Sequence, residues 1–232
     1  MIFAKLILAH LIGDFILQPD AWVAAKEKRK AASPYIYLHV LLHALLSFVL
    51  LWKVKLWWVA AAVGVSHLVI DLSKLYFQKP GNRRLWFFAD QLLHVAVMAI
   101  ISARLGDFNL KMLHEPIVIK AIAGAVFLTS PVSMMIKMLL SSWSPVTVDQ
   151  SKLQTESLVN AGKYIGILER LMVFSFIFVN HWEGVGFMVA AKSVFRFSDL
   201  AEAKQRKLTE YVLIGTLLSF GIAVLTGILV KF

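Results

Sequence analysis

The sequence predicts an all-α, polytopic transmembrane helix bundle, on the basis of composition and of the length of its apolar runs. Of the 232 residues, 59% are hydrophobic and 16% are charged, whereas soluble domains average roughly 45–50% apolar and about 25% charged residues. The mean hydropathy is +0.73, and the apolar runs reach about 20 residues, the length of a helix that crosses a bilayer. This composition excludes a soluble globular domain and a disordered chain. Cysteine is absent, which excludes disulfides and thiolate metal sites.

Eight apolar segments are candidate membrane spans. They are residues 1–18, 35–52, 56–77, 86–104, 116–140, 164–181, 182–196 and 209–230. The first segment is no signal peptide, because His10 and Asp14 interrupt its apolar run and no small-residue cleavage site follows. We expect Pro131 to kink the fifth span. The short seventh span should be tilted, re-entrant or shielded by protein.

The placement of lysine and arginine predicts the orientation of these spans. The connections after spans one, three, five and seven hold 12 basic residues, against 3 in the alternate connections. The positive-inside rule then places the N-terminus outside and the basic loops in the cytoplasm. The net charge of +10 is explained by this topology and by contact with anionic lipid headgroups. Nucleic-acid binding is not expected, because no basic patch with interleaved aromatic residues lies outside the spans.

A long polar stretch, residues 141–163, divides the chain. It separates an N-terminal transmembrane unit, residues 1–140, from a C-terminal transmembrane unit, residues 164–232. The predicted topology makes this stretch cytoplasmic. We expect it to form either an interfacial helix or a solvated linker.

Each of the first four spans carries two side chains of metal-ligand type, four residues apart. The pairs are His10 and Asp14, His39 and His43, His67 and Asp71, and Asp90 and His94. Chance placement of histidine and aspartate would give fewer than one such pair in the whole chain. Residues i and i+4 share one helix face, so four helices would direct up to eight nitrogen and oxygen donors at a common axis. By the predicted topology, all four pairs lie in the cytoplasmic half of the membrane.

This donor set predicts a metal centre in the N-terminal four-helix unit. Buried aspartate costs about 2.5–3.5 kcal/mol in a membrane helix and therefore indicates function. Imidazole and carboxylate without sulfur suit zinc, with manganese or iron as alternatives. Zinc takes four ligands, so eight donors fit two ions, or one ion with aspartates that orient the histidines. Gln18 and Gln91 lie beside the set in the sequence, and they either hydrogen-bond the ligands or mark the headgroup boundary. A proton relay or a metal-free polar network is the alternative.

The C-terminal spans hold a second polar set, made of Glu169, Arg170, Lys192, Arg196 and Glu210. Lys192 and Arg196 are four residues apart and share one helix face. One interpretation is an ion-pair network, Glu169 with Lys192 or Arg196, that holds two helices together. The other is a substrate site built from Glu169, Arg170, Lys192 and Arg196, in which the cations hold a phosphate or carboxylate group. The two interpretations are compatible.

Several motifs resemble those of bacterial membrane proteins grouped as domain-of-unknown-function family 3307. They are HLIGDFILQ, SHLVIDLSK and ADQLLH, followed by the later GILERL, AAKS and TEYVLIGTLLSFG. The resemblance covers most of the chain, least clearly residues 105–160. It implies a multi-pass protein of the bacterial inner membrane and carries no established activity. The HxxxH and HxxxD motifs are also distantly similar to those of predicted membrane-bound metal-dependent hydrolases.

Together these observations predict a metal-dependent hydrolase that acts from the cytoplasmic leaflet on a lipid or lipid-linked, anionic substrate. The metal would activate a water molecule and polarise the scissile group. Asp71 or Asp90, where not consumed as a ligand, would be the general base. Lys192 and Arg196 would hold the anionic headgroup. Two alternatives are a divalent-metal transporter or sensor, since intramembrane His and Asp also line ion pathways, and a His-rich di-iron lipid oxidase.

Overall fold

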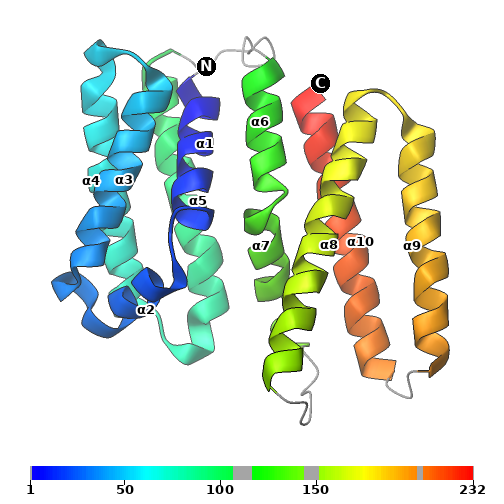
Figure 1. Cartoon of the computed structure of the whole chain (residues 1–232). Helices are drawn as coiled ribbons and strands as arrows, with labels where there is room; N and C mark the ends of the chain where they lie inside the picture. Colours follow the sequence, from blue (N-terminus) through cyan, green and yellow to red (C-terminus); the bar gives the residue numbers. More distant parts are fainter. Residues whose placement is uncertain (1, 107–116, 144–151, 203–205, 232) are drawn as a thin grey trace. The chain divides into compact units, whose positions relative to one another are not determined.

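The computed structural model describes residues 2–106, 117–143, 152–202 and 206–231, with the backbone alone described for 152–160, 195–202 and 206–209. Throughout these ranges the regular structure is helical, as predicted (Figure 1). The α-helices are α1 (Ile2–Phe15), α2 (Asp20–Arg29), α3 (Pro34–Leu51), α4 (Trp57–Phe77), α5 (Arg83–Arg104), α6 (Ile117–Phe127), α7 (Ser130–Leu140), α8 (Lys152–Phe178), α9 (Trp182–Glu202) and α10 (Arg206–Lys231). Three short 3₁₀ turns are η1 (Lys30–Ala32), η2 (Val54–Leu56) and η3 (Pro80–Asn82).

The chain forms two compact units, Met1–Val126 and Phe127–Phe232. The sequence places the division at the polar stretch 141–163, whereas the structure groups α7 with the C-terminal helices, because α7 packs against α8 and α10. Residues 152–163 of that stretch are helical and form the first part of α8. Residues 144–151 lie outside the described part of the chain.

Fewer helices qualify as membrane spans than the eight predicted from the sequence. Four segments are long and apolar enough, namely Pro34–Leu51, Val54–Phe77, Pro80–Arg104 and Glu210–Lys231, and the number rises to six if two bent helix pairs each count as one span. The predicted spans 164–181 and 182–196 belong to α8 and α9, which carry too many charged side chains to qualify over the described residues. The sequence of α8 includes Lys152, Glu156, Lys163, Glu169 and Arg170, and the sequence of α9 includes Glu183, Lys192, Arg196, Asp199 and Glu202. The membrane and the orientation stay predictions.

Two bends of the chain lie at or directly after predicted spans, each of them close to a proline. The first span ends at Phe15, and α2 leaves it at an angle of 82°, with Pro19 as the residue that precedes α2. The fifth span consists of α6 and α7, bent by 42°. Pro131 stands in the first turn of α7, where its missing N–H costs no helical hydrogen bond. The predicted kink at Pro131 is confirmed.

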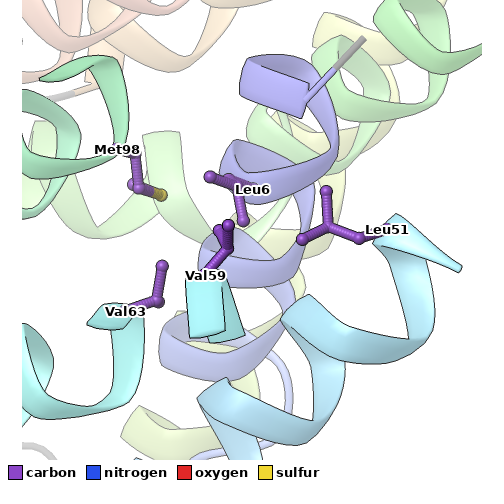
Figure 2. Close-up of a cluster of buried hydrophobic side chains, with 5 residues drawn as sticks. All are labelled: Leu6, Leu51, Val59, Val63 and Met98. Atoms are coloured by element: carbon purple, nitrogen blue, oxygen red, sulfur yellow. The ribbon is translucent and has the colours of Figure 1, made fainter. Parts of the chain in front are cut away.

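Helices α1, α3, α4 and α5 form a four-helix bundle in the N-terminal unit (Figure 1). α3 packs against α1 and α4, and α5 packs against α4 and α1, which closes the bundle. Short connections make neighbouring helices antiparallel. One end of the interior is apolar and contains Leu6, Leu51, Val59, Val63 and Met98 (Figure 2). The other end, where α2 lies (Figure 1), contains the polar side chains described next, among them Lys26 of α2.

Candidate metal centre

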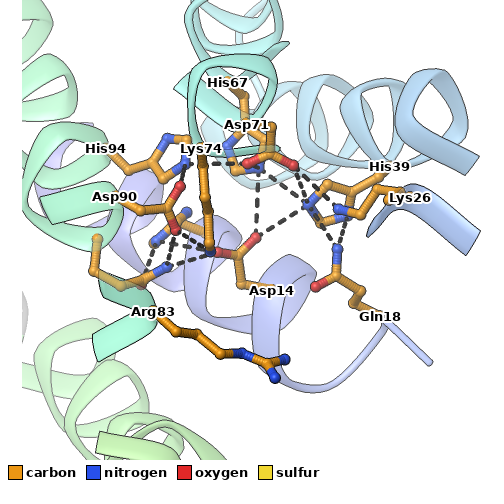
Figure 3. Close-up of polar contacts among 12 residues, drawn as sticks. Asp14, Gln18, Lys26, His39, His67, Asp71, Lys74, Arg83, Asp90 and His94 are labelled. Carbon is orange, nitrogen blue, oxygen red and sulfur yellow. Dashed lines mark hydrogen bonds and ion pairs between the residues drawn. The ribbon is translucent and has the colours of Figure 1, made fainter. Parts of the chain in front are cut away.

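All eight predicted ligands come together at one end of the four-helix bundle (Figure 3). We call the set formed by His10, Asp14, His39, His43, His67, Asp71, Asp90 and His94 the His/Asp cluster. Seven of its members are buried, and the Asp14 side chain is 11% exposed. The cause is local: on each helix the two residues occupy the buried face one turn apart, as where Ile36, His39 and His43 follow one another along α3. The convergence predicted from the spacing is confirmed.

Asp14 lies at the centre of the cluster. Its Oδ1 atom is 3.0 Å from Nε2 of His43, 3.2 Å from Nε2 of His39 and 3.4 Å from Nε2 of His67. Its Oδ2 atom is 3.7 Å from Nε2 of His10 on the same helix. One carboxylate from α1 therefore faces imidazoles from α1, α3 and α4.

Asp71 and Asp90 extend the same arrangement toward α5. The Asp71 carboxylate lies 3.5 Å from Nε2 of His94 and 3.7 Å from Nε2 of His67. Its second oxygen is 3.8 Å from Nε2 of His39. Asp90 Oδ1 is 3.5 Å from Nε2 of His94. Every aspartate of the cluster thus faces at least one imidazole through an Nε2 atom.

The imidazole rings also pack directly on one another. The His67 ring stacks between those of His43 and His94, with centroids 3.8 Å and 4.0 Å away. The Nε2 atoms of His67 and His39 are 3.1 Å apart. Two nitrogens at this distance share one proton in a hydrogen bond, or direct both lone pairs at a common cation. Several imidazoles with converging Nε2 atoms favour the cation.

Several buried atoms of the cluster make no hydrogen bond of acceptable geometry among the described residues, although some of them lie at ion-pair distance from other members of the cluster. They are Asp14 Oδ1, Asp90 Oδ1, His94 Nε2 and both ring nitrogens of His43. Buried polar atoms are nearly always paired, and an unpaired one costs about 1–3 kcal/mol. Unpaired donors and acceptors that converge on one place are the arrangement a metal ion would satisfy.

The distances between these atoms fit metal coordination. Three groups each place one ligand atom per residue within 4.8 Å of the others: His10, Asp14, His43 and His67; His39, His67 and Asp71; and Asp14, Asp90 and His94. Ligand atoms of a tetrahedral zinc site are about 3.3 Å apart, because each lies about 2.0–2.1 Å from the ion. The buried His/Asp groups could therefore hold a metal ion. The three groups share Asp14 and His67 and comprise eight residues in all, which is enough donors for two metal ions.

Two lysines that the sequence reading missed complete the polar end of the bundle. Lys26 Nζ donates to Asp71 Oδ2 at 3.1 Å, and Lys74 Nζ donates to Asp90 Oδ2 at 2.8 Å. Lys74 could have been found, because it follows Asp71 by three residues and so shares its helix face. Lys26 gave no such signal, since it reaches the cluster only through the sharp bend between α1 and α2.

Gln18 and Gln91 hydrogen-bond members of the cluster, as expected from the sequence. Gln18 Nε2 lies 3.1 Å from His39 Nε2. Gln91 Oε1 lies 3.1 Å from His10 Nε2, and its amide nitrogen donates to Asp14 Oδ2 at 3.0 Å and to Asp90 Oδ2 at 3.2 Å. Such outer contacts fix the orientation of metal ligands. Gln91 thereby joins α5 to α1 across the cluster.

Gly13 makes room for the His43 ring, a role that the sequence reading did not assign. A Cβ atom at Gly13 would lie 2.4 Å from Cε1 and 2.5 Å from Nε2 of His43. Distances this short are clashes, so the imidazole of α3 rests against the backbone of α1. The glycine directly before Asp14 in HLIGD was the signal available in the sequence.

A small pocket reaches the cluster from the end of the bundle. It has a volume of about 60 Å³, and its wall includes the carboxylates of Asp14, Asp71 and Asp90 with Lys26 and Lys74. Since one water needs roughly 10–15 Å³ of such space, the pocket holds several waters or one small polar group. The carboxylates are therefore the side of the cluster that a substrate or water can reach.

The C-terminal polar set is engaged in contacts within its own unit. Lys192 Nζ donates to Glu169 Oε1, which joins α9 to α8 as the ion-pair interpretation expects. The Arg196 side chain lies outside the described part of the chain, and Glu210 is exposed on α10. A substrate-binding role for Glu169, Arg170, Lys192 and Arg196 stays a prediction.

Arg170 is buried beside the break between α6 and α7. Its guanidinium donates to the backbone oxygens of Leu128 and Thr129, at 2.6 Å and 3.1 Å, and to the hydroxyls of Ser133 and Ser219, at 2.6 Å and 3.1 Å. A proline-induced break frees backbone carbonyls that a helix would otherwise satisfy. Arg170 supplies a donor to the Leu128 carbonyl in this break and a further donor to the Thr129 carbonyl, which also accepts from Ser133, and this is a structural role.

These observations define a helical protein with several helices able to span a membrane and a buried His/Asp cluster able to bind a metal ion. Residues 2–114 match the family described as "Protein of unknown function (DUF3307)". The matched range contains α1–α5 and the whole His/Asp cluster, so the expected resemblance is confirmed there. The motifs GILERL, AAKS and TEYVLIGTLLSFG fall outside it. No curated protein and no solved structure matches the chain.

Proposed function

We propose that this protein is a metal-dependent hydrolase that acts on a lipid or lipid-linked substrate from the cytoplasmic leaflet of the bacterial inner membrane. The observation that carries the proposal is the convergence of eight His and Asp side chains from four helices, seven of them buried, with the three aspartates on the wall of a pocket. The pocket would give an ion held by these residues access to water or substrate, as catalytic metal sites require.

Zinc is the metal that the donor set favours. Five imidazoles and three carboxylates without sulfur match its ligand preferences, and manganese or iron follows as an alternative. The His/Asp cluster would hold the ion or ions. When bound, zinc supplies a Lewis acid and makes a water molecule acidic enough to act as a nucleophile near neutral pH.

The lysines determine what the aspartates can do. Lys26 donates to one oxygen of Asp71, and Lys74 donates to one oxygen of Asp90. A neighbouring cation favours the ionised form of a carboxylate. An ionised carboxylate on the pocket wall can accept the proton of an attacking water. Asp71 or Asp90 is therefore the proposed general base, and the other completes the ligand set.

Access from one end favours hydrolysis over transport. A transporter needs a polar path through the bundle, and the intramembrane His and Asp residues supply one only at the α2 end. At the opposite end the described interior is closed by the apolar side chains of Leu6, Leu51, Val59, Val63 and Met98 (Figure 2). The same one-sided pocket suits a site that takes a substrate and releases products on one face.

The test is a metal-dependent assay on the full chain in lipid nanodiscs. Zinc-loaded and chelator-treated protein is incubated with phospholipids that carry phosphodiester headgroups and acyl esters, and products are identified by mass spectrometry. We expect cleavage by the zinc-loaded protein alone, with loss in His67→Ala. Zinc uptake into proteoliposomes without cleavage would overturn the proposal in favour of transport, and stoichiometric iron with oxygen-dependent lipid oxidation would favour an oxidase.

Two variants separate the general base from the ligand. Asp71→Asn and Asp90→Asn keep the side-chain volume and remove the charge. The variant of the base should retain the metal and lose turnover at least about 100-fold, the lower range for general base catalysis. The variant of the ligand should lose metal. If both variants retain metal and turnover, neither aspartate has the proposed role.

A further inference from the structure

We propose that a basic vestibule at the mouth of the metal centre binds a phosphate group. The vestibule is a pocket of about 290 Å³ between the end of α2 and the α4–α5 connection. Its wall is formed by Glu27, Lys30, Leu75, Gln78, Lys79, Pro80 and Arg83. That the vestibule is the entrance for a substrate rests on the proposed function. The phosphate group is the part of that substrate that the vestibule would bind.

The vestibule and the inner pocket are neighbours that share part of their walls. Glu27, Leu75 and Gln78 line both of them. A group bound in the vestibule therefore lies next to the pocket whose wall carries Asp71 and Asp90. The last turn of α4 forms the shared side, because Lys74 points inward to Asp90 while Gln78 and Lys79 follow at the helix end.

The vestibule carries a positive charge. Three cations, Lys30, Lys79 and Arg83, face one carboxylate, that of Glu27. Arg83 pairs with Glu27 at 3.1 Å, but both side chains are largely exposed, 55% and 41%, and such a pair contributes little stability. A phosphate can therefore compete for the guanidinium, which binds phosphate oxygens in a bidentate manner.

The two lysines of the vestibule form no ion pair with a carboxylate among the described residues. Within the described residues, neither Lys30 nor Lys79 has an Asp or Glu oxygen within 4.0 Å. Lys30 Nζ instead lies 4.7 Å from the centre of the Tyr76 ring. The N-terminus of α5 adds to this charge, because the 22-residue helix begins at Arg83 and has no acidic residue in its first turn. The amide groups of a helix N-terminus attract anions.

The vestibule has room for a headgroup. Its volume of about 290 Å³ is at the lower end of the range of ligand pockets, about 300–1,000 Å³, so it accommodates a phosphate with a small substituent. Tyr76, Phe77 and Leu85 lie next to it in the sequence and are 53%, 64% and 70% exposed. Apolar chains attached to the phosphate would lie along these side chains. A phosphate from a lipid headgroup and a soluble phosphate share the same recognition chemistry.

The inner pocket is acidic, so binding of a phosphate in the vestibule and its reaction at the metal centre should have different requirements. Its wall contains four carboxylates, Asp14, Glu27, Asp71 and Asp90, against two lysines, Lys26 and Lys74. Without a metal this pocket repels an anion, and the phosphate stays in the vestibule. With the metal the reacting group can advance. Phosphate binding should thus be independent of the metal, whereas turnover should require it.

The test measures phosphate binding to the full chain in detergent, with and without zinc. Inorganic phosphate and a short-chain phosphatidic acid are titrated in separate arms by calorimetry. The double variant Lys79→Ala/Arg83→Ala removes two vestibule cations. The matched control Lys53→Ala/Lys55→Ala removes two cations from the connection at the opposite end of the bundle. Zinc content and the thermal midpoint of each variant verify that the bundle is folded.

We expect the vestibule variant to bind both probes at least tenfold more weakly in either metal state, since a charge-assisted hydrogen bond contributes about 1.5–3 kcal/mol. The control should bind as the wild type does. Tighter binding of phosphatidic acid than of inorganic phosphate would identify the lipid headgroup as the source.

Equal loss in both double variants, or no loss in either, would overturn the inference. Binding that requires zinc would place the phosphate at the metal and also overturn it. Metal-independent binding without any turnover would leave the vestibule intact and contradict the hydrolase.

Discussion

Buried polar side chains occur in both units of this protein, and their hydrogen bonding differs. In the C-terminal unit the guanidinium of Arg170 donates to two backbone oxygens and two hydroxyls. In the N-terminal unit the His/Asp cluster retains five buried atoms without a hydrogen bond among the described residues. A satisfied buried group stabilises the fold that surrounds it. Converging atoms that lack hydrogen bonds indicate a place where a ligand binds. By this difference we distinguish the structural site around Arg170 from the functional His/Asp cluster.

The largest effect that tests this comparison is the loss of metal from His67→Ala. His67 belongs to two of the three groups of candidate ligands, so its removal affects both. We expect the metal content per chain, measured by elemental analysis, to fall at least tenfold. His181→Ala, a change of an exposed histidine in the α8–α9 connection, is the control and should keep the metal. Equal metal content in the two variants would mean that the cluster is not the site.

The converse test is Arg170→Met, which should reduce stability and leave the metal in place. The change removes the guanidinium donor from the Leu128 carbonyl and from the Ser219 hydroxyl, whereas the Thr129 carbonyl keeps its hydrogen bonds from Ser133. Each buried group left unpaired costs about 1–3 kcal/mol. Thermal unfolding should therefore begin at a clearly lower temperature than in the wild type. If Arg170→Met instead unfolds like the wild type and loses activity or metal, Arg170 has a functional role and the comparison is wrong.

Gly13→Ala tests how closely the cluster is packed. The new methyl group would meet the His43 ring at 2.4–2.5 Å, so the imidazole must move. A displaced ligand should weaken metal affinity by about 10–100-fold, the range typical of disturbed ligand orientation. Gly81→Ala is the matched control, because a Cβ at that position meets no atom within 4 Å. Competition with a metal-sensitive dye measures both affinities, and equal values would show that His43 is not a ligand.

The smallest expected effect concerns the ion pair between Glu169 and Lys192. Their side chains are 17% and 25% exposed, and partly solvated ion pairs contribute about 0.2–1 kcal/mol. A double-mutant cycle with Glu169→Gln and Lys192→Met should give a coupling energy in that range. The single variants should keep wild-type turnover if the pair only joins α8 to α9. A large loss of turnover with unchanged stability would support the substrate role predicted for these residues.

The sequence predicted the cluster because its defining signal is local. Residues four apart on one helix lie on the same helix face whatever the fold. The interior of a bundle is the place where such faces of four helices meet. Lys26 and Gly13 could not be found in the same way. Lys26 depends on the 82° bend before α2, and Gly13 on the close approach of α1 to His43. Both are consequences of packing between segments distant in sequence.

The number of spans was overpredicted for a related reason. Apolar residues dominate 164–181 and 182–196, so hydropathy alone suggests two spans. The charged side chains of α8 and α9 disqualify both helices. Arg170 illustrates the difficulty: its acceptors lie in the break between α6 and α7, on α7 and on α10, at sequence separations of 37 to 49 residues. Only the packed structure shows that such a charge is satisfied by its neighbours.

The central claim is that the His/Asp cluster binds a metal ion, and the metal content of the wild-type protein tests it most directly. The full chain is purified without chelators, analysed for zinc, manganese and iron, and then titrated with zinc after stripping. We predict one or two equivalents of metal per chain, recovered on titration and reduced at least tenfold in His43→Ala and Asp71→Ala. A wild-type protein that carries no metal and binds none on titration would contradict the account.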